Sequence, residues 1–250
     1  MKILGVIPSR YDSSRFPGKP LADIAGKSMI QRVFEQCQKS KSLSDLVVAT
    51  DDDRIFDHVR NFGGNAVMTS TNHTSGTDRC HEALHKLGSA NFNYVINIQG
   101  DEPFIQPTQI DKVAALLKGD VSLASLAVPT KSLSAILDKD KTHVVFTKDM
   151  NALYFSREPI PHIKNTSHEE WTSKSLHYIH LGIYGYSKDV LKEVVNLPKS
   201  SLEVAESLEQ LRWMENGYKI KLGLTNEVSY GIDRPEDIEK VLKMHSGKSA

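Results

Sequence analysis

The sequence predicts an α/β protein with a mostly parallel sheet and a more β-rich sub-domain inserted into it. In the first 120 residues, short β-branched runs alternate with stretches of helical apolar spacing. These runs are almost continuously apolar, which is typical of parallel strands that helices cover on both faces. After about Gly119, strand-like runs follow one another with few helices between them. The change indicates a second structural part in the middle of the chain.

In the first part, strands and helices are expected in alternation. The stretch Ser28–Ser40 carries apolar residues at helical spacing, and Asp51–Gly64 has acidic residues at its start and glycines at its end, as helices prefer. A third helix is expected over Asp78–Gly88. The expected strands are Ile3–Ile7, Asp45–Thr50, Asn65–Ser70 and Tyr94–Asp101.

The second part is expected to return to the first near its end. Its predicted strands are Ser122–Pro129, His143–Thr147, Ala152–Ser156 and His177–Ser187. Helices are predicted over Lys188–Leu197 and Leu202–Gly217, followed by a strand over Lys219–Leu224 and a closing helix over Pro235–Met244, with Pro235 in its first turn. We therefore expect one core from residues 1–120 and 218–245, and an inserted sub-domain from residues 121–217.

The composition is that of an ordinary globular protein. Charged residues make up 25% and hydrophobic residues 39% of the 250 residues, and basic and acidic residues both total 31. A general nucleic-acid binder would carry a basic excess, so any basic site here must be local. Apolar runs stay well below the ~20 residues of a membrane span. We expect a cytoplasmic protein whose two cysteines, Cys37 and Cys80, are isolated thiols.

A long basic loop follows the first strand. It holds Arg10, Arg15 and Lys19 against one acid, Asp12, and it exceeds the usual connection of about 4–6 residues. Cations near a glycine and a helix start suit a phosphate, and ligands of open α/β sheets bind beyond the strand ends. The loop matches neither the P-loop nor the G-x-G-x-x-G pattern. The alternative is a solvated surface loop.

Two aspartates are candidates for a divalent cation. Asp101 ends the strand in NIQGDEP next to the permissive Gly100, where a cation would meet a phosphate. Asp233 follows a short apolar run in GIDRPEDIE. Both also suit capping of the structure that follows, although Arg234 occupies the usual cap position before Pro235.

Several other residues have a functional and a structural interpretation. The segment TSGTDR, Thr74–Arg79, could cap a helix or receive a base or sugar. His180 and Tyr184 have the even spacing that puts two side chains on one face of a strand. Asp52 and Asp53 favour helix capping. Arg157 at a strand end and the pair Glu209 and Gln210 in a helix remain open between the two interpretations.

Taken in order, these segments resemble the 3-deoxy-manno-octulosonate cytidylyltransferases, or CMP-KDO synthetases. The resemblance rests on IPSRYDSSRFPGKPL, VATDD, TSGTDR, NIQGDEP, LAVP, ALYFSREPIP, HLGIYGY, LEQLR and GIDRPEDIE, from about residue 3 to residue 240. It implies a nucleotide-diphospho-sugar transferase-like (Rossmann-like) fold. It also implies a reaction in which the anomeric hydroxyl of KDO attacks the α-phosphorus of CTP. The products are CMP-KDO, for lipopolysaccharide synthesis, and pyrophosphate.

The resemblance further implies Mg²⁺ as cofactor and a cytoplasmic homodimer that acts on CTP and KDO, without nucleic-acid or membrane partners. The core would bind the nucleotide, and residues 121–217 would bind the sugar and form the dimer. Carried over by position, the phosphate and catalytic residues are Arg10, Arg15, Lys19 and Asp101, and the metal ligands are Asp101 and Asp233. The substrate-binding residues are Ser75, Gly76, Thr77, Arg79 and Gln99 for the nucleotide, and Arg157, His180, Tyr184, Glu209 and Gln210 for the sugar acid.

One departure from the family lies in the basic loop. Family members often carry Ala-Arg-Tyr-Ala where this chain has Ser9 and Asp12 at the outer positions. Because Asp12 lowers the local positive charge, we expect it to form a salt bridge with Arg10 or Arg15.

Three alternatives remain open on the sequence. The acid sugar could be 8-amino-KDO or a sialic acid. A glycosyltransferase would need a DxD metal motif, which Asp51 and Asp53 match formally. A non-catalytic module would bind the nucleotide without releasing pyrophosphate.

Overall fold

The computed structural model describes residues 1–13, 15–228 and 230–246, which form two compact units. The first unit consists of residues 1–114 and the described part of 229–250, and the second consists of residues 115–228. Within the described ranges, no helix has the length and apolarity needed to cross a membrane.

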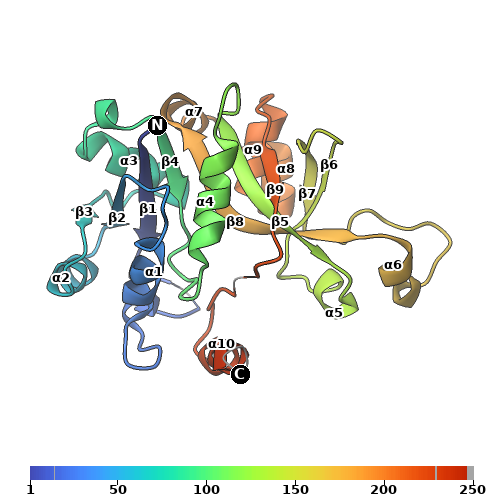
Figure 1. Ribbon diagram of the computed structural model, residues 1–250, viewed down its shortest axis with the longest axis horizontal. Helices are drawn as coiled ribbons and strands as arrows, with labels where there is room; N and C mark the ends of the chain where they lie inside the picture. The colour runs from blue at the N-terminus through green and yellow to red at the C-terminus, as the bar shows by residue number, and fades with distance from the viewer. Residues whose placement is uncertain (14, 229, 247–250) are drawn as a thin grey trace. The chain divides into compact units, whose positions relative to one another are not determined.

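The first unit is built on four parallel strands in the order β3-β2-β1-β4. As Figure 1 shows, β1 (Ile3–Ser9) lies between β2 (Asp45–Thr50) and β4 (Tyr94–Asn97), and β3 (Ala66–Met68) flanks β2. In this register Val6 lies opposite Val47 on one side and Asn97 on the other. Since all pairs are parallel, the carboxyl ends of the strands meet at one edge, where ligands of such sheets bind.

Helices of the first unit begin where their capping residues predict. Ser28, Asp52 and Ser75 each accept a backbone N–H of the first turn that they cap, an interaction worth about 1 kcal/mol. This confirms the capping expected of Asp52. The elements are η1 (Lys19–Leu21), α1 (Met29–Cys37), α2 (Asp53–Asn61), α3 (Gly76–Lys86), η2 (Ser89–Asn91), α4 (Pro107–Leu116) and α10 (Asp237–Ser246).

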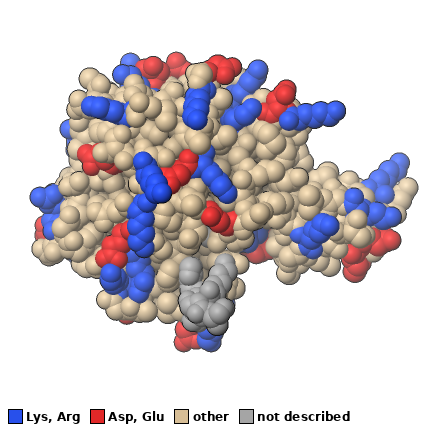
Figure 2. All heavy atoms as spheres, viewed as in Figure 1, with Lys and Arg blue, Asp and Glu red and all other residues tan. Residues whose placement is uncertain are grey.

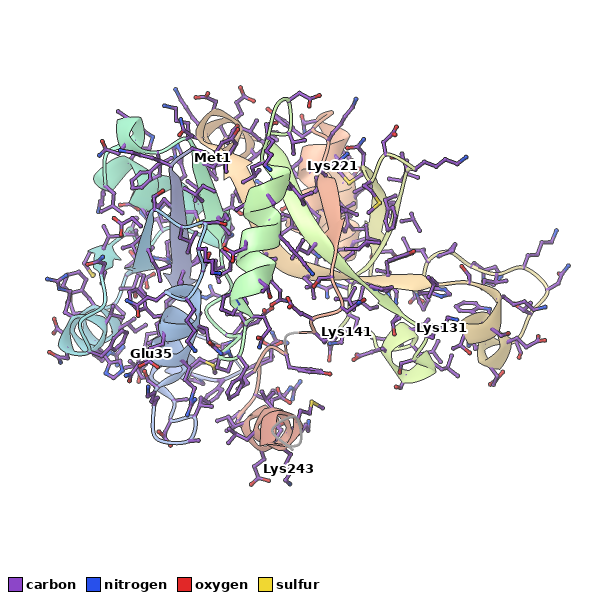
Figure 3. All side chains as sticks on the ribbon, in the orientation of Figure 1. Met1, Glu35, Lys131, Lys141, Lys221 and Lys243 are labelled. Carbon is purple, nitrogen blue, oxygen red and sulfur yellow. The ribbon has the colours of Figure 1, made fainter. Side chains whose placement is uncertain are left out.

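Two details of the first unit differ from expectation. Helix α4 was not predicted; it begins in the polar segment PTQ, which carries no apolar periodicity. Helix α10 begins at Asp237, so Pro235 precedes it rather than lying in its first turn. The Asp237 carboxylate accepts the backbone N–H of Asp233 and of Arg234, at 3.2 and 3.0 Å. Lys243 lies on the exposed side of this helix (Figure 3), opposite the buried Val241.

The second unit has a mixed sheet, as expected of the β-rich part. Strand β5 (Leu123–Thr130) pairs antiparallel with β8 (His177–Ser187) and parallel with β9 (Lys221–Leu224). Strands β6 (His143–Phe146) and β7 (Ala152–Ser156) form an antiparallel pair, and β6 also meets β8. Because β9 pairs with β5, it belongs to this unit and not to the core, where residues 218–245 were expected.

The helices of the second unit are short. A single helix was predicted over 202–217, but the chain forms α8 (Ser201–Glu206) and α9 (Glu209–Glu215). Ser207 separates them in a left-handed conformation, with φ +53°. The apolar stripe continues across this break, which is why periodicity did not reveal it. The other helices are α5 (Leu133–Ile136), α6 (His168–Lys174) and α7 (Lys188–Val194), of which only α7 was expected.

On the face drawn in Figure 2, basic and acidic side chains are intermixed. This agrees with the equal totals of the two charge types.

Candidate active site

Two carboxylates of the first unit converge on one lysine. Lys19 Nζ lies 2.8 Å from Asp101 Oδ2 and 3.3 Å from Asp233 Oδ1. Arg15 Nη2 also reaches Asp233 Oδ1, at 3.1 Å. The lysine comes from the basic loop, Asp101 follows β4, and Asp233 precedes α10. Three segments that are remote in the sequence therefore meet at one charged cluster.

The carboxyl ends of β1 and β4 come together through a glycine. A Cβ placed on Gly100 would lie 2.8 Å from the carbonyl oxygen of Pro8, closer than real Cβ contacts. At Gly76, the start of α3, an added Cβ would lie 3.4 Å from the Pro8 ring and 3.5 Å from the Asn97 amide, which is ordinary van der Waals contact. A glycine at position 100 is therefore needed for the chain before Asp101 to pass this close to the Pro8 backbone of β1.

The basic loop is held by its own backbone and by aromatic contacts. Gly18 N donates to Tyr11 O at 3.0 Å, and Gly18 adopts a left-handed conformation with φ +70° against the Tyr11 ring. The guanidinium of Arg54 lies 3.3 Å from the centre of that ring. Phe16 packs on a cluster of Ile24, Met29, Ile232 and Val241. These contacts hold the segment of the loop that carries Arg15 and Lys19.

The salt bridge expected of Asp12 is wrong. Among the described residues Asp12 pairs with neither Arg10 nor Arg15, because Arg15 binds Asp233 instead. Arg10 is exposed, and it forms no ion pair within the described ranges. Asp12 acts on Arg54: the pKa of that guanidinium is raised, chiefly by its hydrogen bond to Asp52, with a smaller contribution from the Asp12 charge.

The start of α3 lies at the same edge of the sheet. Ser75 caps the helix in a reciprocal arrangement with Asp78, and Thr77 in the first turn is buried. The expected residues Ser75, Gly76 and Thr77 thus occupy a helix N-terminus, which favours anionic ligands. Gln99 lies just beyond β4 and is half-buried.

Two polar atoms at this edge have no hydrogen-bond partner within the described part of the chain. They are Ser9 Oγ, at the end of β1, and Asn97 Oδ1, at the end of β4, and both are buried. A buried polar group without a partner costs about 1–3 kcal/mol, so such groups point to a polar ligand. Sequence reasoning did not assign them a role. Their position at the carboxyl ends of parallel strands is the signal that could have found them.

Arg79 differs from its expected role in nucleotide binding. Its side chain is buried, and its Nη2 lies 2.8 Å from Asp51 Oδ2 while Nη1 bonds to Thr69 Oγ1. A buried guanidinium needs such partners, and these contacts commit Arg79 to an internal ion pair. The same pair occupies Asp51, the first aspartate of the formal DxD motif, while Asp53, the second, is exposed in the first turn of α2.

In the second unit, Arg157 is fixed at the end of β7 by Glu206. Its backbone N donates to Glu206 Oε2 at 2.7 Å. Its guanidinium lies 3.4–3.5 Å from the carbonyl oxygens of Asp140, Glu206 and Ser207. The Glu206 carboxylate also accepts Ser156 Oγ at 2.9 Å. Glu206 was not singled out from the sequence, because a glutamate at the end of an amphipathic helix carries no distinctive signal.

His180 is electrically neutral in this setting. Burial, together with the nearby charge of Arg157, lowers its pKa to about 3. Its ring lies 4.9 Å from that of Phe155 and 5.2 Å from that of Tyr184, so the predicted neighbours on β8 do meet. A neutral imidazole cannot attract a carboxylate by charge. Arg157 is the cation of this group.

Tyr184 presents a buried hydroxyl. Burial raises its pKa, with a further contribution from the charge of Glu209, and its hydroxyl has no hydrogen-bond partner within the described ranges. Glu209 Oε1 lies 3.0 Å from Arg212 Nη2, and Gln210 is buried beside it on α9. The candidates thus form two sets, one within each unit: a charged set of cations and carboxylates, and a mostly buried polar set around Arg157.

The carboxylate pair has the chemistry of a Mg²⁺ site. Mg²⁺ prefers hard oxygen ligands and is usually bound by one or two carboxylates together with phosphate oxygens. Asp101 and Asp233 both reach the position of one lysine ammonium, so both can reach one cation. The described residues hold no cluster of three or more His, Cys, Asp and Glu side chains suited to a metal.

Comparisons with known proteins identify the family of the chain. Curated relatives include the 3-deoxy-manno-octulosonate cytidylyltransferase of Parabacteroides distasonis, 50% identical over 247 residues with 97% of each chain covered. Another is that of Thermodesulfovibrio yellowstonii, 47% identical with 96% of each covered. A solved structure of CMP:2-keto-3-deoxy-manno-octonic acid synthetase complexed with CTP matches with a TM-score of 0.90 and 40% identity, covering 99% of this chain and 100% of that one.

A more distant structure bears on the fold alone. The 4-diphosphocytidyl-2C-methyl-D-erythritol synthase of Anaerococcus prevotii matches with a TM-score of 0.62 at 14% identity, over 98% of this chain and 99% of that one. Together with the closer structural relative, it confirms the predicted α/β fold of the nucleotide-diphospho-sugar transferase type. The family described as cytidylyltransferase matches residues 4–220. The chain therefore belongs to the cytidylyltransferase family, in the group of 3-deoxy-manno-octulosonate cytidylyltransferases.

Proposed function

We propose that this enzyme transfers CMP from CTP to the anomeric hydroxyl of KDO, giving CMP-KDO and pyrophosphate for lipopolysaccharide synthesis. The observation that carries the proposal is the convergence of Asp101 and Asp233 on Lys19, since it joins a two-carboxylate cation site to a phosphate-binding lysine. The curated relatives named above, half identical over nearly the whole chain, support the substrates.

The first unit would bind the nucleotide. A triphosphate carries about four negative charges, which must be neutralised before an alcohol can attack. Lys19, Arg15 and the exposed Arg10 supply positive charge from one loop, and Lys19 and Arg15 are already oriented by Asp233. The carboxyl ends of β1 and β4 lie near the start of α3. The polar side chains there, Ser9, Asn97 and Gln99, would bind the rest of the nucleotide.

Mg²⁺ would be held by Asp101 and Asp233, where it would supply Lewis-acid polarisation of the phosphate that is attacked. The protein's own part is to position and to neutralise. The Lys19 ammonium holds the carboxylates of Asp101 and Asp233 at 2.8 and 3.3 Å from its Nζ. The Asp237 carboxylate fixes the backbone of Asp233. Positioning and electrostatics of this kind provide most of the acceleration in phosphoryl-group transfer.

The second unit would bind the sugar acid. Arg157 offers a permanent charge for the carboxylate, and its guanidinium is oriented by three carbonyl oxygens. Neutral His180 and the buried Tyr184 hydroxyl would instead meet sugar hydroxyls. Glu209 and Gln210 would complete this pocket, as the resemblance implies.

We also propose the cytoplasmic homodimer that the resemblance implies. Exposed apolar side chains on the second unit support a contact there: Leu153 on β7 is 58% exposed, and Val204 on α8 is 66% exposed. Light scattering of the purified protein tests this proposal. A mass of one chain across the micromolar range contradicts it.

The direct test of the reaction is pyrophosphate release, with KDO, 8-amino-KDO and a sialic acid each offered with all four nucleoside triphosphates and Mg²⁺. We expect release with CTP and KDO. Higher kcat/KM with another acid sugar would keep the enzyme class and change the substrate. CTP binding without pyrophosphate release for any sugar acid would overturn the proposal in favour of a non-catalytic module.

A further inference from the structure

The Ser125 side chain contacts the His180 ring at an irregularity in the pairing of β5 with β8. Ser125 of β5 is opposite Tyr184 of β8, but the next residue, Leu126, is opposite Leu181. Two residues of β8, Gly182 and Ile183, are therefore extra at this point and form a bulge. Bulges commonly re-aim side chains near functional sites. Here the bulge turns two backbone carbonyls toward the Ser125 side chain.

The Ser125 hydroxyl has three close neighbours. Its Oγ lies 2.8 Å from Ile183 O, 3.2 Å from Leu181 O and 2.9 Å from His180 Nε2. The residue is fully buried, so water does not compete for these contacts. A hydroxyl has one proton to donate, and carbonyl oxygens can only accept.

These contacts favour one tautomer of the His180 ring. If the hydroxyl proton of Ser125 went to His180 Nε2, the Ser125 oxygen would face two carbonyl oxygens at 2.8 and 3.2 Å with no proton between them. Donation to a carbonyl of the bulge avoids this, and Ser125 Oγ then meets His180 Nε2 as an acceptor. Nε2 must then be protonated, and in a neutral imidazole Nδ1 is the bare acceptor nitrogen. Within the described residues, Nδ1 has no hydrogen-bond partner.

We propose that Ser125 is a positioning residue that holds His180 as the Nε2–H tautomer, so that Nδ1 accepts a hydrogen bond from a hydroxyl of the sugar acid. The inference rests on the proposed function and deepens it, because it assigns His180 to a hydroxyl and leaves the carboxylate to Arg157. It also accounts for a buried serine on a strand whose other buried side chains, from Leu123 to Val128, are apolar.

The first test needs no substitution at Ser125. Long-range ¹H–¹⁵N correlation spectra of histidine-labelled protein distinguish the tautomers, and His180→Gln identifies the signals of His180 among the ten histidines. We expect a protonated, pyrrole-type Nε2 and a bare, pyridine-type Nδ1 at neutral pH. The reverse assignment, or a rapidly exchanging mixture, overturns the proposal. This result does not depend on any catalytic activity.

The second test is Ser125→Ala with Thr130→Ala as matched control, since both remove one hydroxyl from β5. Loss of the constraint should mix the tautomers of His180 and raise KM for the sugar acid about 3- to 10-fold, the scale of one hydrogen bond, with kcat and the KM for CTP changed less than twofold. Thr130→Ala should change neither spectrum nor KM. If Ser125→Ala mixes the tautomers but leaves this KM unchanged, the substrate role of Nδ1 is refuted.

The two proposals fail separately. Absence of pyrophosphate release by the wild-type enzyme with any acid sugar would refute the function, while the tautomer of His180 would still be measured. A misfolded Ser125→Ala variant would leave the wild-type spectrum as the deciding result.

Discussion

Ile232 N donates a hydrogen bond of 2.9 Å to Asp101 O, and this bond ties the segment before α10 to the end of β4. It places Asp233 next to Asp101, although the two lie on opposite sides of the whole second unit in the sequence. Lys19 then spans both side chains. The first prediction follows from this arrangement of backbone and charge.

Asp101→Asn and Asp233→Asn should each lower kcat by at least about 10²-fold, the scale of losing one key electrostatic group. The amide keeps the size of the side chain but removes the charge that would hold Mg²⁺. Pyrophosphate release measured over a range of Mg²⁺ concentrations checks this, and Asp57→Asn, an exposed carboxylate on α2, is the matched control. Turnover near the wild-type rate in both site variants would end the metal assignment.

Lys19→Ala should slow catalysis or raise the KM for CTP, by about 10-fold or more, because a charged group in contact with phosphate contributes about 1.5–3 kcal/mol. Steady-state kinetics at saturating sugar acid measure both parameters. Lys27→Ala is the control, since that lysine pairs with Glu35 on α1 at the surface. If neither parameter moves for Lys19→Ala, the basic loop does not bind the phosphates.

Gly100→Ala should destabilise the protein, because its Cβ would lie 2.8 Å from Pro8 O, a backbone atom that cannot move without shifting β1. Overpacking of this kind costs about 1–3 kcal/mol of unfolding free energy. Urea denaturation checks the loss. Gly231→Ala is the control, since among the described residues no atom outside its chain neighbours lies within 4 Å of the added Cβ. Equal stability of the two variants would contradict the close crossing of β1 and β4.

Glu206→Ala should raise the KM for the sugar acid about 10-fold and leave the KM for CTP unchanged. The Glu206 carboxylate fixes the Arg157 backbone at 2.7 Å and the Ser156 hydroxyl at 2.9 Å, so its removal loosens the strand end that presents the guanidinium. Glu158→Ala, an exposed neighbour, should change neither value. A rise in the KM for CTP alone would show that Arg157 does not serve the sugar acid.

The stability of the protein should fall as the pH drops from 6.5 to 5. The pKa of His180 is lowered from 6.5 to about 3 by burial, so between these values the unfolded chain binds a proton that the folded protein does not. Stability therefore rises with pH in this window, by at most about 1.4 kcal/mol per pH unit for one such group. His143 and His177, whose pKa values burial also lowers, add to the slope.

Urea denaturation at pH 5, 5.75 and 6.5 measures this slope, in a range above the usual titration of carboxylates. His180→Gln should reduce the slope, since glutamine does not titrate. An identical slope in the wild-type protein and in His180→Gln would show that His180 is not held neutral by the fold.

Much of the fold followed from local pattern. The alternation of apolar runs and amphipathic stretches predicted β1, β2 and β4 and the helices between them, because strand and helix periodicities differ and the parallel strands are buried. The same reasoning missed α4 and the short α5 and α6, whose apolar stripes are brief. It also joined α8 and α9, because a left-handed Ser207 leaves no mark on apolar spacing.

By itself, the sequence determined the α/β class, the basic loop, the two aspartates at the strand and helix ends, and the resemblance to the family, since each depends on residues close together in the chain or on motifs in order. Only the tertiary structure decided the partners. Arg15 pairs with Asp233 and not with Asp12, and the buried Arg79 pairs with Asp51. The Ser125 hydroxyl contacts the His180 ring. Such partnerships depend on which charges and lone pairs meet when distant segments pack, and on how much water packing removes from them, and neither is encoded in spacing along the chain.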